Sequence, residues 1–87
     1  MRPIRTPKDL GNAVRRARRD RGLSQAQLAA RAGVGRPWLS ELETGKRTVE
    51  LGRVLAVLAA LELTVTLTAE TTGDTRVDLD DILRRPS

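Results

Sequence analysis

The chain contains no cysteine, histidine, phenylalanine or tyrosine, and its one aromatic residue is Trp38. The absence of thiols and imidazoles excludes disulfides and the usual zinc ligand sets. The aromatic side chains on which single-stranded RNA stacks are also missing. Nothing indicates catalysis, since there is no phosphate-cradling glycine loop and the adjacent Asp80 and Asp81 lie on a short polar face. We expect neither an enzyme nor a bound metal or cofactor.

Long apolar segments are missing as well. The longest apolar run, Val54 to Leu61, is far shorter than the roughly 20 residues that span a bilayer. The N-terminus lacks the apolar stretch of a secretory signal, so we expect a soluble, cytoplasmic protein that does not contact a membrane. A chain of 87 residues buries a small core, and with no disulfide or metal to stabilise it, association with another chain is expected.

Charge is spread unevenly along the sequence. Residues 1–63 carry 13 Lys/Arg against 6 Asp/Glu, a net +7, whereas residues 64–87 carry 3 against 5, a net −2. A basic body favours a polyanionic partner such as nucleic acid, although a basic protein without that role has the same composition. The acidic end is then available for a different contact.

The first half of the chain contains sequence signals that predict three helices. Thr6 and Asp9 form a capping pattern around Pro7, which predicts a helix over 7–21 ending before Gly22. Ser24 and Gln27 repeat that pattern for a short helix that ends before Gly33. After a Gly-Val-Gly turn, a third helix is predicted over 36–44. Two short helices joined by such a turn form a helix-turn-helix arrangement.

The second half of the domain is more apolar. A fourth helix is predicted over 50–61, with Leu51, Val54, Leu55 and Leu58 buried and a second apolar side that favours a symmetric partner. Apolar residues then alternate with threonines over 63–69, which predicts a half-buried strand. This strand pairs either with its copy in a dimer or, as a hairpin, with residues 76–79.

The sequence resembles a known family at specific residues. Four segments are similar to the XRE/Cro/C1 helix-turn-helix proteins. They are Gly22-Leu23-Ser24-Gln25-Ala26-Gln27-Leu28-Ala29, Ala32-Gly33-Val34, Leu39-Ser40-Glu41-Leu42-Glu43 and Gly45-Lys46-Arg47. The segments around Arg5 and over 61–67 resemble HipB-like antitoxins. The resemblance implies a mainly α fold, a lambda-repressor-like four-helix bundle with a C-terminal β-strand that pairs across a homodimer. We divide the chain into an arm (1–6), the DNA-binding domain (7–62), a dimerisation strand (63–70) and a tail with a short helix (71–87).

The resemblance also implies site residues. The third helix is the expected recognition helix, with base contacts at Arg36, Pro37 and Glu41, while the start of the second helix and the loop after the third contact phosphates. Glu41 is equally compatible with a solvated face, and Trp38 with packing on the core. The expected DNA-contacting set is Ser24, Gln25, Gly35, Arg36, Pro37, Trp38, Ser40, Glu41, Lys46 and Arg47.

Other residues are assigned to architecture and to partners. The family pattern pairs Arg18 with Glu43 as a structural ion pair. We assign the dimer interface to Val57, Leu61, Leu63, Val65 and Leu67. An apolar stripe in the tail is the expected partner-binding segment, formed by Leu79, Ile82 and Leu83. The groove that receives this stripe belongs either to a toxin or to the protein's own dimer.

Three functions fit these residues. The first is a repressor of an inverted-repeat operator that is also the antitoxin of a HipBA-like system, with double-stranded DNA and a HipA-like Ser/Thr kinase toxin as partners. The second is a stand-alone phage- or stress-type repressor without a toxin. The third is a protein–protein adaptor, which binding to duplex DNA with a steep salt dependence excludes.

Overall fold

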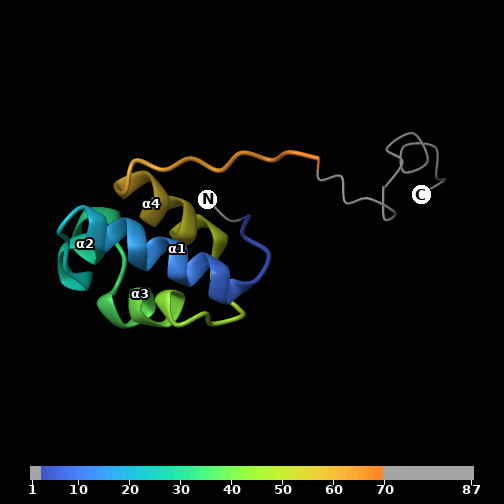
Figure 1. The fold of residues 1–87 in the computed structure, drawn as a ribbon. Helices are drawn as coiled ribbons and strands as arrows, with labels where there is room; N and C mark the ends of the chain where they lie inside the picture. Colours follow the sequence, from blue (N-terminus) through green and yellow to red (C-terminus); the bar gives the residue numbers. More distant parts are fainter. Residues whose placement is uncertain (1–2, 70–87) are drawn as a thin grey trace.

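The structure, a computed structural model, describes residues 3–69. Within this range it contains four helices: α1 (Pro7–Asp20), α2 (Gln25–Ala32), α3 (Arg36–Glu43) and α4 (Leu51–Ala60). Figure 1 shows them gathered into one bundle, with α2 and α3 following each other beside α1. Each helix begins and ends within one residue of its predicted range. None of the helices in the described part is long and apolar enough to cross a membrane.

Helix starts follow the predicted capping chemistry. The Thr6 hydroxyl accepts a hydrogen bond from the Asp9 amide at 3.0 Å, and the Asp9 carboxylate accepts one from the Thr6 amide at 3.2 Å. Ser24 and Gln27 make the same reciprocal pair at 3.0 and 2.8 Å. Both capping boxes are thereby confirmed, and they satisfy amides that the helices leave without partners. Gly33 ends α2 in the left-handed conformation, with φ of 71°.

One core joins all four helices. Its fully buried side chains come from every helix and from the residue after α4: Val14, Leu28, Leu39, Leu42, Val57 and Leu61. Helix α2 packs against α3 and α4, and α1 packs against α3. Since each helix contributes only two or three buried residues, the position of every helix depends on its neighbours.

The buried face of α4 agrees with the prediction only in part, since Val54 and Leu58 are buried as expected. Leu51 and Leu55 were expected inside, yet they are 68% and 46% exposed. Val57 and Leu61, assigned to a dimer interface, are instead fully buried in the chain's own core. The interface assignment of these two residues is therefore wrong, because neither has surface to offer a second copy. The apolar pattern of α4 runs almost all round the helix, so it gives no direction to the buried side.

Residues 63–69 leave the end of α4 and extend past the helices (Figure 1). Leu63 packs against the core, whereas Val65 and Leu67 are 59% and 92% exposed. The structure assigns no strand between residues 3 and 69. A strand needs a neighbour for its backbone hydrogen bonds. The strand predicted here therefore stays a prediction, and its hairpin alternative involves residues outside the described range.

Gly11 sets the distance between α1 and α3. A Cβ at this position would lie 2.5 Å from the Leu42 carbonyl oxygen and 2.6 Å from that of Glu43. Both obstacles are backbone atoms of α3, which cannot turn aside as a flexible side chain does. Close approach of the two helices thus requires glycine at residue 11.

Two glycine substitutions in helices should have opposite effects on stability. We expect Gly11→Ala to lower the free energy of unfolding by about 1–3 kcal/mol, because overpacking against α3 outweighs the gain in helix propensity. Gly52→Ala in α4 should be neutral or stabilising by up to about 1 kcal/mol, since its Cβ would meet the nearest atom, Glu50 Oε1, at 3.6 Å. Urea unfolding at equal protein concentration measures both values. A Gly11→Ala protein as stable as the Gly52→Ala protein would show that α1 and α3 do not need this close contact.

Candidate nucleic-acid interface

Helices α2 and α3 are joined by a tight turn. Gly33 adopts a left-handed conformation, and the Val34 amide donates to the Ala29 carbonyl at 3.0 Å. Leu28 of α2 and Leu39 of α3 have no exposed surface. The buried leucines and the hydrogen-bonded turn fix the angle between the two helices, which is the geometry that holds a recognition helix outward.

The outward face of α3 carries the residues predicted to contact bases. Arg36, Pro37 and Glu41 are exposed, whereas Leu39 and Leu42 point into the core. Arg36 is the first residue of the helix, and Gly35 before it is its exposed N-cap. Ser40 is half-buried beside this face. The structure therefore places a cation, an apolar ring and an acid on one accessible surface.

Trp38 lies at the edge of this surface and packs on the core. It is half-buried against the core cluster, as the packing alternative predicted. The guanidinium of Arg53 from α4 lies 6.0 Å from the centre of the indole ring. This separation is at the outer limit of a cation–π contact. Trp38 thus joins α3 to α4 while keeping part of its ring exposed.

The start of α2 presents free backbone donors. Ser24 caps the helix through Gln27, but the amides of Gln25 and Ala26 have no hydrogen-bond partner among residues 3–69. The Gln25 side-chain amide donates to Glu43 Oε1 at 3.3 Å, so its side chain holds α2 against α3. Unpaired amides at a helix N-terminus attract phosphate. Gln25 therefore offers its backbone to an anion while its side chain serves the fold.

The end of α3 is closed by a Schellman motif. The Lys46 amide donates to the Glu41 carbonyl at 3.0 Å, and the Gly45 amide donates to that of Leu42 at 3.1 Å. Gly45 has φ of 90°, and a Cβ there would lie 2.9 Å from Lys8 Cα. The motif brings Lys46 back over the last turn of α3, where its Nζ lies 2.9 Å from Glu41 Oε2.

Two further cations border this loop. Arg47 is exposed and makes no ion pair or hydrogen bond with other described residues. Lys8, in the first turn of α1, is brought beside the loop by the close approach to Gly45. Lys8 and Arg53 are not among the predicted site residues, because their proximity to the site depends on contacts between distant helices. No local pattern in the sequence indicates either contact.

Arg18 and Glu43 form a buried ion pair beneath the surface. Arg18 Nε and Nη2 donate to the two carboxylate oxygens of Glu43 at 2.8 and 2.9 Å, and Arg18 Nη1 donates to the Leu23 carbonyl at 2.8 Å. The side chains are only 10% and 3% exposed. Every buried side-chain polar atom in the described residues has a partner. The pair therefore ties α1 and the loop before α2 to the end of α3.

The charge of Arg18 is stabilised by its partner. The hydrogen bonds that Arg18 donates to Glu43, together with the negative charge of Glu43, raise the pKa of Arg18 against the lowering effect of burial. A pKa raised in the folded state contributes stability that is lost only when the pH rises through that pKa. Arginine already titrates far above the physiological range, so alkaline conditions up to pH ~10 do not remove the arginine charge from the pair.

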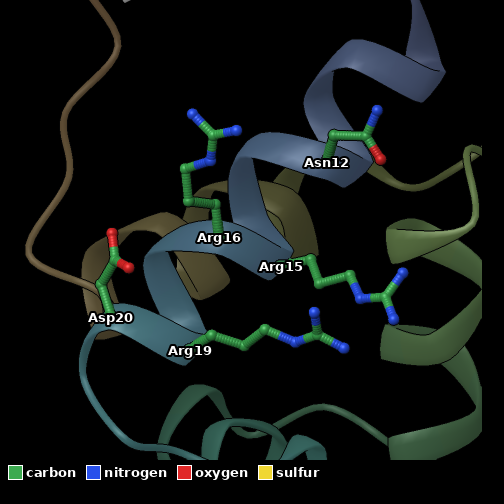
Figure 2. A pocket seen from close by; sticks show the side chains of 5 residues that line it. All are labelled: Asn12, Arg15, Arg16, Arg19 and Asp20. Carbon is green, nitrogen blue, oxygen red and sulfur yellow. The ribbon is translucent and has the colours of Figure 1, made fainter.

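A face of α1 gathers uncompensated arginines (Figure 2). Arg15, Arg16 and Arg19 line a shallow hollow of about 390 Å³ together with Asn12 and Asp20. Arg15 and Arg19 extend to one side of the helix and Arg16 to another. None of the three arginines forms an ion pair within residues 3–69. They add to the positive potential of the domain without a direct structural role.

The structure brings most of the predicted DNA-contacting residues onto one surface. The predicted partner-binding residues Leu79, Ile82 and Leu83 lie outside the described residues. No group of three potential metal ligands occurs in residues 3–69.

A capped α2, a glycine turn and an outward α3 on a four-helix core define a helix-turn-helix protein. Residues 9–71, more than half of the chain, match the helix-turn-helix domain family, and the protein belongs to that family. The predicted resemblance to XRE-type helix-turn-helix proteins is confirmed by this match and by the relatives found.

Curated and solved relatives support the same family. An uncharacterized HTH-type transcriptional regulator, y4mF, of Sinorhizobium fredii is 42% identical over 66 residues, which are 76% of this chain and 87% of that protein. HipB in a HipB–O4 20mer complex is 29% identical with a TM-score of 0.73, covering 78% of this chain and 96% of HipB. The controller protein C.AhdI of Aeromonas hydrophila is 33% identical with a TM-score of 0.63, covering 67% and 88%.

The two glutamates of α3 should differ sharply in their effect on stability. We expect Glu43→Ala to lower the free energy of unfolding by about 3–5 kcal/mol, because it leaves Arg18 buried without its counterion. Glu41→Ala removes an exposed pair and should change stability by less than about 1 kcal/mol. Urea unfolding followed by circular dichroism at fixed concentration tests both variants. Similar losses from the two substitutions would mean that the Arg18–Glu43 pair does not hold the helices together.

Proposed function

We propose that the protein is a homodimeric repressor that binds double-stranded DNA sequence-specifically, and that it serves as the antitoxin of a HipBA-like system. The observation that carries the DNA-binding proposal is the composite surface of α3, the α2 N-terminus and the 44–47 loop. Three anion-attracting features border the exposed helix face: free amides at Gln25 and Ala26, Lys46 with Arg47, and Lys8 beside them. Such a surface fits a helix in the major groove with phosphates on both sides.

Bases and phosphates are contacted by different residues in this proposal. Arg36 stands at the first position of α3, where recognition helices approach base edges, and its guanidinium matches the two acceptors of guanine. Pro37 has no amide hydrogen and offers an apolar contact, suited to a thymine methyl group. Arg47 lies in the loop after the helix and contacts phosphate. Duplex binding with a steep salt dependence tests the surface as a whole.

Two arginine substitutions should separate these roles. Arg36→Ala should weaken binding to the preferred site by about 1–3 kcal/mol and relax base preference at one position of each half-site. Arg47→Ala should weaken binding to all sequences about equally and reduce the slope of log K against log salt by about 1. Fluorescence anisotropy with preferred and scrambled duplexes measures both. If Arg36→Ala left base preference unchanged, the residue would be a phosphate contact and its assignment to a base would be wrong.

The proposed homodimer is supported by apolar side chains that stay exposed to solvent in a single chain. Leu51 and Leu55 lie one turn apart on the outer face of α4, and Val65 and Leu67 follow in the next segment, all of them exposed. Leu63 is half-buried and packs against the core. A second copy related by a two-fold axis covers the same patch on both chains and offers residues 63–69 a pairing partner. This arrangement replaces Val57 and Leu61 with Leu51 and Leu55 in the proposed interface.

A charge placed on this patch should prevent association. We expect the wild-type protein to be a dimer at micromolar concentration and Leu55→Glu to be monomeric, because burying a carboxylate opposite its own copy is costly. Ile4→Glu is the control, since Ile4 is also exposed but lies outside α4 and the 63–69 segment. Sedimentation equilibrium gives the masses, and circular dichroism verifies folding. A wild-type monomer would contradict the dimer, and a dimeric Leu55→Glu protein would exclude this patch.

The antitoxin role is supported by similarity to HipB. A chain of the HipA–HipB–O2–O3 complex matches with 29% identity and a TM-score of 0.72, covering 78% of this chain and 96% of that chain. Similarity to the restriction-modification controller C.AhdI favours the second candidate, a regulator without a toxin partner. Binding of a HipA-like Ser/Thr kinase to the purified protein separates the two candidates. Shortening the chain to residues 1–75 then tests whether Leu79, Ile82 and Leu83 contribute to that binding.

A further inference from the structure

Glu41 is the one acid on the proposed DNA-facing side of α3, where its charge opposes an approach to phosphates. We infer that Glu41 and Lys46 act as one base-recognition unit, in which the lysine neutralises and orients the carboxylate so that it accepts a hydrogen bond from an exocyclic amino group, that of cytosine. This inference rests on the proposed DNA-binding function and names a specificity determinant within it.

The pair is organised by the backbone. The Schellman motif that ends α3 fixes the Lys46 amide on the carbonyl of Glu41 itself, at 3.0 Å. The Thr44 hydroxyl donates to the same carbonyl at 3.0 Å. Left-handed Gly45 completes the turn, with φ of 90°. The backbone of Lys46 is therefore fixed next to that of Glu41. This reduces the conformational entropy lost when the two side chains form their ion pair.

One carboxylate oxygen remains available. Lys46 Nζ donates to Glu41 Oε2 at 2.9 Å, whereas Glu41 Oε1 receives no hydrogen bond from any residue of the described chain. Both side chains are 50% exposed, so the pair contributes little to folding stability. A neutralised pair with one free acceptor on the outer face of α3 complements an amino donor in the major groove, and glutamate accepts there from cytosine N4.

This arrangement differs from a lysine that only contacts phosphate. If Lys46 acted alone, its loss would weaken binding by the same factor whatever stands at position 41. If it neutralises Glu41, its loss leaves a bare carboxylate facing the duplex, and the damage depends on that carboxylate. The two cases are distinguished by a double-mutant cycle.

The test begins with selection of a preferred site by the wild-type full chain from a random duplex library. Affinities for that site are then measured for Glu41→Gln, Lys46→Met and the double variant. We expect Lys46→Met to weaken binding about tenfold or more in the wild-type background but less than about threefold in the Glu41→Gln background. Repeating the selection with Glu41→Gln should change one preferred base from cytosine towards adenine, which glutamine recognises.

Arg47→Met is the matched control, because it removes a neighbouring cation that makes no contact with Glu41 in the structure. It should weaken binding by equal factors in both backgrounds. Equal losses from Lys46→Met in both backgrounds, or unchanged base preference in Glu41→Gln, would overturn the recognition unit while leaving DNA binding intact. A wild-type protein that selects no site would overturn the proposed function and this inference with it. Thermal unfolding verifies that each variant is folded.

Discussion

The ion pair between Arg18 and Glu43 is the contact on which the arrangement of the first three helices depends. Two parallel hydrogen bonds join the arginine to the glutamate, a third reaches the Leu23 carbonyl, and Gln25 adds a fourth contact to the same carboxylate. A bidentate pair of this kind fixes orientation as well as distance. In a core built largely of leucine, valine and alanine, which pack in several ways, a directional contact selects one arrangement.

The close contact at Gly11 works with that pair. Gly11 lets the backbone of α1 meet the carbonyl oxygens of Leu42 and Glu43, so that Arg18, two turns further along α1, reaches the carboxylate of Glu43. The same approach places Lys8 beside Gly45 and thus beside the loop that follows α3. Packing within the domain therefore determines which cations lie beside α3. The charge pattern of the surface is a consequence of the fold rather than an independent feature.

Much of this architecture follows from local sequence signals, and the parts that do not have identifiable reasons. Thr6, Ser24 and Gly33 determine helix ends through contacts within four residues, so their roles are visible in the sequence. The buried side of α4 was predicted correctly for Val54 and Leu58 but not for Leu51 and Leu55, since a helix that is apolar almost all round has no unique inward face until its neighbours are placed. Arg18 with Glu43 was predicted only from family resemblance, because their separation of 25 residues carries no local signal. The strand expected over 63–69 stays a prediction, because its backbone needs a hydrogen-bonding neighbour that residues 3–69 do not supply.

Helix α3 divides its residues between two tasks with little overlap. Leu39, Leu42 and Glu43 face inward and hold the helix, while Arg36, Pro37 and Glu41 face outward and contribute little to the core. Substitution of the outward residues is therefore expected to leave the domain folded, so that their proposed role can be tested separately from stability. The helix is only eight residues long, however, and Glu41 shares its last turn with the buried Glu43. Because the backbone of that turn is held by the Arg18–Glu43 pair, the outward side chains keep a fixed direction, which is the condition for distinguishing one base edge from another.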